Sequence, residues 1–404
     1  MAALIDPSRT SQALRERSQI SFVDMARWMA AMMVMVGHLR NPLILGYGDL
    51  AAGERPIWVQ GWFFVTGFHA EAVLVFFVLS GYLVGGLSAV RAWAGSFRLE
   101  SYAIDRVSRL FIAFIPALFL TLALDWAGAR WFGGTGLYDG THPMIIAKNH
   151  GIVFQDFLTP GIFFGNMAMV QYYFVPELGS NSPLWTLSTE FWFYAVFGLL
   201  LAGWLARSGA SRWVQIGLGL VFAAILGPEF IGFFGLWLIG FLVALIPSRR
   251  FAWPLIAAGA LFVWLAFLRL NDAWFDAHLG WKLAGQYVMA LLFGWLIHAM
   301  SCHRYRLFEW LQPFNKFMAD FSYSLYLIHF PVMIFLMAVL GSVTGLAGFA
   351  NAFSPADPMG VIFYAGLIGA ILVISWLFAQ ATERHTARLR NGLKAGFGVV
   401  GGGS

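Results

Sequence analysis

The chain of 404 residues is 60% hydrophobic and only 11% charged, with a mean hydropathy of +0.72. This composition excludes an ordinary soluble domain and predicts an all-α integral membrane protein that crosses the bilayer many times. The net charge of +5 is modest, and we expect no nucleic-acid partner. The single cysteine, Cys302, excludes a disulfide framework and a cysteine-based metal site.

The start of the chain resembles a signal peptide, because three arginines precede the first apolar run: Arg9, Arg15 and Arg17. The run ends without a convincing cleavage site of the small-x-small type. It also contains Asp24 and Arg27, which a disposable segment rarely carries. We therefore interpret residues 1–19 as a cytoplasmic segment followed by a retained membrane anchor.

Ten apolar runs are long enough to cross a bilayer, near residues 22–44, 70–90, 110–128, 184–205, 213–227, 230–247, 253–269, 283–300, 320–341 and 358–380. The fifth and sixth are separated only by the tight turn Gly227-Pro228-Glu229. We predict one transmembrane domain over residues 20–385 and a cytoplasmic tail over 386–404. The terminal run Gly401–Ser404 resembles an artificial linker.

The distribution of lysine and arginine predicts the orientation of these helices. With the N-terminus in the cytoplasm, eighteen of the 25 cationic residues fall in inside segments and six in outside segments, with Arg27 inside the first helix. Because cytoplasmic loops carry an excess of Lys and Arg, both termini are expected in the cytoplasm.

This orientation places the longest loop, residues 129–182, on the outer side. The loop combines aromatic and hydrogen-bonding residues: Tyr138, Asp139, His142, His150, Asp156, Asn166, Gln171, Tyr172, Tyr173, Glu177 and Asn181. Aromatic faces with polar tips are typical of a glycan-binding surface, but they are equally typical of an interfacial belt.

The first apolar run contains an unusual polar stripe. Arg27 and His38 are eleven residues apart, so on a helix they share a face and lie roughly 16 Å apart along the axis. Because a charge near the bilayer centre costs roughly 3 kcal/mol or more, intramembrane ionisable residues usually face a partner or a wet cavity. The alternative is that Arg27 reaches the cytoplasmic surface and His38 the outer interface.

Two further stretches have a structural and a functional interpretation. Ser80-Gly81 in the second helix indicates a packing notch, although its hydroxyl and exposed backbone would also suit a substrate path. Arg106 and Arg109 share a helical face at the cytoplasmic boundary. They form either a positive-inside anchor or a cradle for phosphates.

Two later helices carry polar groups among apolar residues. Glu190 lies one or two turns below the outer surface and must be paired or functional, although it could simply balance an arginine. Tyr323, Tyr326 and His329 follow at three-residue spacing, but an isolated helix histidine is more often a core residue. The nine histidines are scattered, and we predict no metal site.

In this order, these stretches resemble the membrane acyltransferase-3 family, which includes polysaccharide and exopolysaccharide O-acyltransferases. The resemblance rests on Arg27 and His38 with ten residues between them, Phe76-Phe77-Val-Leu-Ser80-Gly81-Tyr82, Arg106/Arg109, Trp185-Thr-Leu-Ser-Thr-Glu190 and Ser322-Tyr323-Ser-Leu-Tyr326-Leu-Ile-His329. It covers about residues 20–385. Two features differ from the usual pattern, Ala70-Glu71-Ala72 in place of a glycine and the late position of Pro116, and they leave the subfamily open.

The resemblance implies a multi-pass enzyme of the bacterial inner membrane that takes acetyl groups from cytoplasmic acetyl-CoA to a hydroxyl of an extracytoplasmic glycan. We expect Arg106 and Arg109 to hold the phosphates of the donor, and Arg27 to guide its pantetheine or a phosphate. His38 would be the general base.

The remaining candidates would assist that reaction. The hydroxyls of Ser80 and Tyr323 would bind the oxyanion, with His329 as a further substrate-binding residue, and Glu190 would orient the acceptor or His38. A covalent acyl-histidine relay and a succinyl group remain open. The other classes that we considered are a transporter or flippase with a polar relay, and a non-catalytic scaffold for glycan assembly. The sequence reveals neither the acceptor nor the oligomeric state.

Overall fold

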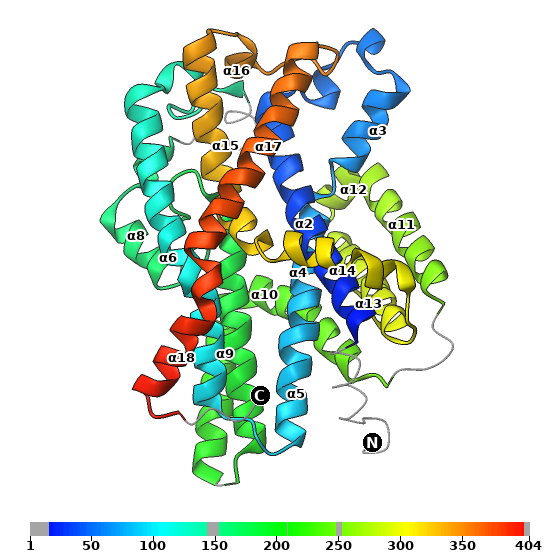
Figure 1. The fold of residues 1–404 in the computed structure, drawn as a ribbon, viewed down its shortest axis with the longest axis vertical. Coiled ribbons are helices and arrows are strands. Elements are labelled where there is room, and N and C mark those ends of the chain that lie inside the picture. Colours follow the sequence, from blue (N-terminus) through cyan, green and yellow to red (C-terminus); the bar gives the residue numbers. More distant parts are fainter. Residues whose placement is uncertain (1–15, 144–152, 208, 248–252, 400–404) are drawn as a thin grey trace.

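The computed structural model describes residues 16–143, 153–207, 209–247 and 253–399. Outside these ranges lie Arg9, Arg15, Lys148, His150, Arg249, Arg250 and the terminal linker Gly401–Ser404. Within them the chain is helical, with two isolated β-bridges and no extended strand (Figure 1). The all-α membrane fold predicted from composition is therefore confirmed.

The helices that build the bundle are α2 (Arg17–Leu43), α3 (Ile57–Val65), α4 (His69–Ser80), the π-helical turn η4 (Gly81–Gly85), α5 (Gly86–Trp93), α6 (Leu99–Trp131), α8 (Pro160–Met167), α9 (Trp185–Leu205), α10 (Gly209–Leu245), α11 (Pro254–Leu270), α12 (Asp272–Ala277), α13 (Leu279–Ser301), α14 (Arg306–Ala319), α15 (Ser322–Thr344), α16 (Gly348–Asn351), α17 (Pro358–Ala381), the 3₁₀ turn η8 (Glu383–His385) and α18 (Thr386–Gly396).

Among the described residues, eight helical segments are long and apolar enough to cross a membrane. Two features explain why this number is below the predicted ten. Helix α10 contains two helices joined at Gly227, whose φ of 87° only glycine adopts readily, with Pro228 directly after it. Helix α11 has 17 residues and is too short to count as a full span. All ten predicted apolar runs nevertheless fall on helices.

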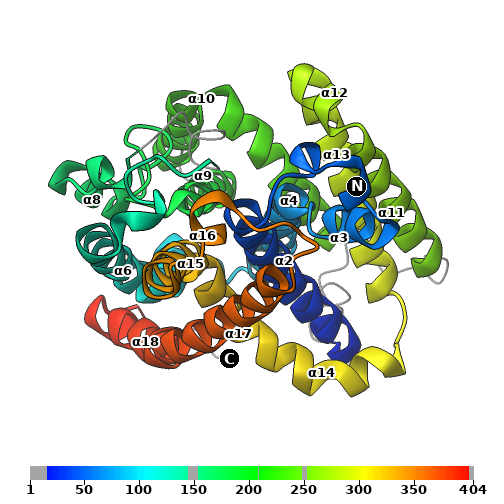
Figure 2. The same cartoon turned by 90° about the horizontal axis from the view of Figure 1, so that it is seen from above.

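Helix α2 lies near the centre of the bundle. Figure 2 shows α4, α15 and α17 arranged around it. Small residues on α2 allow this close approach, because Ala30, Ala31 and Gly37 are buried against its neighbours. A Cβ atom at Gly37 would lie 3.0 Å from the Cβ of His69, so glycine here brings α4 against the His38 turn of α2.

Helices α4 and α10 touch through two glycines. A Cβ atom at Gly81 would lie 1.9 Å from the carbonyl oxygen of Trp237, and one at Gly240 would lie 1.9 Å from that of Val78. The backbones therefore meet directly, and the packing notch predicted at Ser80-Gly81 is confirmed.

Several polar side chains of the long loop are buried, and they either hold the loop together or join it to the bundle. Asn166 donates to the carbonyl oxygens of Ile162 and Pro176, and Asn181 donates to Thr121 Oγ1 at 3.0 Å. His142 is also buried, and burial lowers its pKa to about 4. These side chains are therefore not displayed to an outer ligand.

The two ends of the described chain lie on one side of the bundle. In Figure 1 the beginning of α2 and the whole of α18 lie in the lower half, whereas α16 lies at the top. This arrangement agrees with termini on a common side of the membrane. Their cytoplasmic location stays a prediction.

Candidate active site

A cavity of about 700 Å³ opens between α2, α4, α6, α9, α15 and the segment that follows α17. Six of the eight predicted site residues line it: Arg27, Ser80, Arg106, Arg109, Glu190 and Tyr323. Among the described residues that line this cavity, neither His38 nor His329 occurs. The structure thus divides the predicted site into a cavity and a separate pair of histidines.

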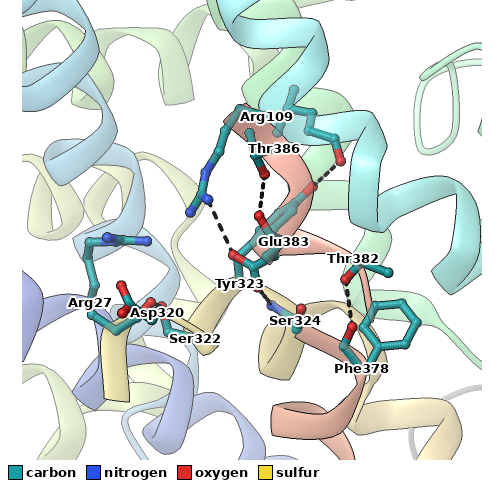
Figure 3. Close-up of polar contacts among 12 residues, drawn as sticks. Arg27, Arg109, Asp320, Ser322, Tyr323, Ser324, Phe378, Thr382, Glu383 and Thr386 are labelled. Atoms are coloured by element: carbon teal, nitrogen blue, oxygen red, sulfur yellow. Dashed lines mark hydrogen bonds and ion pairs between the residues drawn. The ribbon is translucent and has the colours of Figure 1, made fainter. Parts of the chain in front are cut away.

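Charged side chains of both signs line the cavity. The cations are Arg27, Arg106, Arg109 and Arg384, and the carboxylates are Glu190, Asp320 and Glu383. Figure 3 shows Arg109 beside Glu383 on one side of this polar region and Arg27 with Asp320 on the other. The formal excess of one positive charge favours an anionic ligand.

Arg109 is anchored by a residue near the end of the chain. Its Nη1 lies 3.3 Å from Glu383 Oε2, and the side chain of Glu383 is only 3% exposed. The other carboxylate oxygen of Glu383 accepts a hydrogen bond from the Ser324 backbone N–H at 2.7 Å. The η8 turn thereby joins α6 to α15 and closes one wall of the cavity.

Arg106 is held less tightly than Arg109. Its guanidinium lies near the rings of Tyr102 and Tyr194, at 6.0 and 5.8 Å from their centroids. Its Nε is buried and has no hydrogen-bond partner among the described residues. An anionic ligand in the cavity would supply the missing acceptor.

Ser80 belongs to a hydrogen-bonded chain that ends on Glu190. The Trp237 indole N–H donates to Ser80 Oγ at 3.1 Å, and Ser80 Oγ lies 2.9 Å from the Tyr194 hydroxyl. Tyr194 in turn donates to Glu190 Oε1. Because that donation uses the Tyr194 proton, the Ser80 hydroxyl donates to Tyr194.

The hydroxyl proton of Tyr323 is also engaged. It donates to the carbonyl oxygen of Leu110 at 2.9 Å, while the ring lies 5.5 Å from the Arg109 guanidinium carbon. The hydroxyls of Ser80 and Tyr323 therefore shape the cavity wall, and neither donates into the cavity in this arrangement.

His38 and His329 form a stacked, hydrogen-bonded pair. His38 Nδ1 lies 2.9 Å from His329 Nε2, and the ring centroids are 5.2 Å apart with an interplanar angle of 19°. His329 is fully buried, whereas His38 is partly buried. A third ring, that of His69, lies 5.5 Å from His38.

The contacts of His329 fix the protonation pattern of the neutral pair. His329 Nδ1 lies 2.9 Å from the carbonyl oxygen of Tyr326, and a carbonyl can only accept, so Nδ1 carries the hydrogen. Nε2 of neutral His329 is then an acceptor, and His38 must donate to it from Nδ1. His38 Nε2 therefore keeps its lone pair, as a general base requires.

Sequence reasoning missed several residues of the site. Glu383 was not singled out and Arg384 was counted only among the inside cations, although a carboxylate so close to the end of the last apolar run was a detectable signal. His69 gave no signal of its own. It is brought to His38 by the approach of α4 at Gly37.

Comparisons with known proteins identify the family of the chain. Residues 20–380 match the acyltransferase-3 family model, which is described as an acyltransferase domain. Nodulation protein 10 of Rhizobium leguminosarum bv. viciae is 29% identical over 215 residues, which cover 50% of this chain and 48% of that protein. The chain thus matches about half the length of this curated relative, and no solved structure matches.

The family match covers most of the chain, including the three histidines of the cluster and the cavity-lining residues of α2, α4, α6, α9 and α15, and it ends at residue 380, just before Glu383 and Arg384. It also includes every predicted site residue. This multi-pass membrane protein therefore belongs to the acyltransferase-3 family of membrane acyltransferases.

Proposed function

We propose that this protein is an O-acyltransferase of the bacterial inner membrane that transfers an acetyl group from cytoplasmic acetyl-CoA to a hydroxyl of an extracytoplasmic glycan. One observation carries the proposal. Helices α2 and α15 each pass from the arginine-lined cavity, at Arg27 and Tyr323, to the histidine pair. Along both helices, a site suited to an anionic donor would thus lie next to the proposed general base.

The cavity suits the polar end of an acyl-CoA. Its volume of about 700 Å³ lies within the usual range for ligand pockets, roughly 300–1,000 Å³. Arg106 and Arg109 would bind phosphate oxygens, with the buried Arg106 Nε as a donor that has no acceptor within the described part of the chain. Arg27 lies on α2 below His38 and would contact a phosphate or the pantetheine arm.

The reaction needs one general base, and overall it neither takes up nor releases a proton. His38 Nε2 takes the proton of the acceptor hydroxyl as the hydroxyl oxygen attacks the thioester carbonyl. The carbon–sulfur bond breaks, and the leaving thiolate takes the proton from His38 to give free coenzyme A and the ester. His329 would hold His38 in the tautomer that leaves Nε2 basic.

Glu190 has a supporting role in this proposal. Its carboxylate accepts from Tyr194 and balances the arginines of the cavity, so it would position the donor or the acceptor. Ser80 and Tyr323 would contribute to substrate binding through the cavity walls that they form.

The test measures thiol release from acetyl-CoA by purified, detergent-solubilised protein, with crude cell-envelope glycan as the acceptor. Wild type is compared with His38→Ala, and with His303→Ala as a matched control, because His303 is exposed. Release should rise with glycan and fall roughly 10²- to 10⁴-fold in His38→Ala, while the control behaves like wild type.

Parallel reactions separate the open alternatives. Succinyl-CoA tests the other acyl group, and label retained on the protein without acceptor would indicate a covalent acyl-histidine relay. Full activity in folded His38→Ala would contradict the assignment of the base. Movement of a solute across vesicles without thiol release would favour the transporter interpretation.

A further inference from the structure

Three residues on one face of α15 lead from the cavity to the histidine pair. Tyr323 and Tyr326 line the cavity, and His329 is the next residue at the same spacing but lies outside it. A spacing of three residues corresponds to roughly 4.5 Å along a helix. The cavity therefore ends about one helical turn short of His329.

Helix α4 shows the same boundary on the opposite wall. Ser80, Phe76 and Val73 line the cavity along one stripe, and His69 follows one turn beyond Val73. The His69 ring lies 5.5 Å from that of His38. The two helices run in opposite directions, and the cavity ends at Tyr326 on α15 and reaches Val73, one turn beyond Phe76, on α4.

Two aromatic rings meet near this end of the cavity. The centroids of Phe76 and Tyr326 are 5.4 Å apart, in an edge-to-face contact. The Tyr326 ring also lies 5.9 Å from the His329 ring, so it contacts the cavity on one side and the histidine pair on the other. Tyr326 is only 7% exposed.

Tyr326 is held in place by the start of α9. Its hydroxyl lies 2.8 Å from Thr186 Oγ1, which in turn donates to the carbonyl oxygen of Pro183 at 3.0 Å. Phe76 has no comparable restraint, because its side chain is a hydrocarbon. One ring of the boundary is therefore fixed, and the other is held by packing alone.

We propose that Phe76 and Tyr326 form an aromatic filter that determines the size of the acyl group admitted to the histidine pair. The inference rests on the proposed function and adds the specificity of the donor. The bulky phosphate end stays among the arginines, and the thioester end must pass between the two rings to reach His38. A compact acetyl group passes when Phe76 turns aside, whereas a longer acyl group needs both rings to move.

The experiment compares donors of increasing chain length: acetyl-CoA, butyryl-CoA and hexanoyl-CoA. For each donor, kcat/KM for thiol release in the presence of cell-envelope glycan is measured with wild type and with Phe76→Ala. The kcat/KM ratio of butyryl-CoA to acetyl-CoA should rise by about tenfold or more in Phe76→Ala, since a single methylene is worth roughly that much in a tight pocket.

Two further variants keep the test decisive. Phe76→Leu is the milder change and should shift the ratio in the same direction by less. Tyr326→Phe keeps the ring but removes the bond to Thr186, so it should also relax the preference for acetyl. Leu83→Ala is the matched control, because Leu83 lines the same cavity on η4, beyond Ser80 and away from the boundary. It should leave the ratio unchanged.

The outcomes separate this inference from the proposed function. If wild type releases no thiol from any acyl-CoA, the proposed function itself fails. If wild type is active and the donor profiles of Phe76→Leu and Tyr326→Phe match it, or if Leu83→Ala changes the ratio as much as Phe76→Ala, the filter is refuted.

Discussion

The arginine-lined cavity and the histidine pair share α2 and α15, yet they are built in opposite ways. The cavity uses long charged side chains such as Arg109, whose side chain is 39% exposed and has one ionic partner. The histidine pair uses short rings, and His329 is fully buried with its ring nitrogens engaged. Adaptable charges suit binding of a flexible anion, whereas locked rings suit proton transfer at a defined atom.

The comparison predicts that substitutions in the two regions have different kinetic signatures. Changes in the histidine pair should lower kcat, because they alter the base without touching the donor. Changes in the cavity should raise the donor concentration needed for half-saturation. The three predictions below test this separation, from the largest expected effect to the smallest.

The largest effect is expected for His329. His329→Leu removes the acceptor that holds the His38 Nδ1–H, so kcat should fall by about 10²-fold while acetyl-CoA affinity stays close to that of wild type. His329→Gln is the matched variant, because its amide oxygen can still accept from His38 and should preserve part of the activity. Equal losses in both variants would mean that His329 only fills space.

A smaller effect is expected in the cavity. Arg106→Gln and Arg109→Gln should each raise the half-saturating acetyl-CoA concentration by roughly ten- to a hundredfold, the usual range for a hydrogen bond to a charged group. The measurement is thiol release over a range of donor concentrations. Arg98→Gln is the control, because Arg98 is exposed and does not line the cavity. A fall in kcat without a change in the half-saturating donor concentration would contradict the expected difference between the cavity and the histidine pair.

The smallest effect is expected for Glu383→Gln. The amide can still accept from the Ser324 N–H, but it loses the ion pair with partly exposed Arg109, which is worth about 1 kcal/mol or less. Thermal unfolding in detergent should therefore start a few degrees lower, and the half-saturating donor concentration should change less than in Arg109→Gln. An effect as large as that of Arg109→Gln would show that Glu383 itself contributes to donor binding.

The fold was predictable because the membrane imposes a simple rule. A spanning segment must be apolar and helical, so all ten apolar runs predicted from hydropathy fall on helices. Even the tight turn at Gly227 and Pro228 was visible, since only glycine readily adopts that backbone angle. Eight spans are counted among the described residues because α10 runs through this turn as one element and α11 is too short for a full span.

The site was predictable in its parts but not in its assembly. Arg27 and Glu190 were detectable because charges are costly inside a bilayer, and Arg106 because it shares a helical face with Arg109. The pairing of His38 with His329 was not detectable, because it depends on the rotation of α2 against α15. The involvement of Glu383 depends in the same way on how α17 returns to the bundle.

The position of Glu383 has a consequence for the order in which the protein is made. The ribosome delivers α2 and α15 before the η8 turn, so a nascent chain can bring His38 to His329 before Glu383 is made. Until η8 arrives, the Ser324 N–H and Arg109 lack the carboxylate that joins them in the finished fold. The histidine pair can therefore form before the cavity wall that Glu383 completes, and a chain terminated before η8 would carry a histidine pair without a closed cavity beside it.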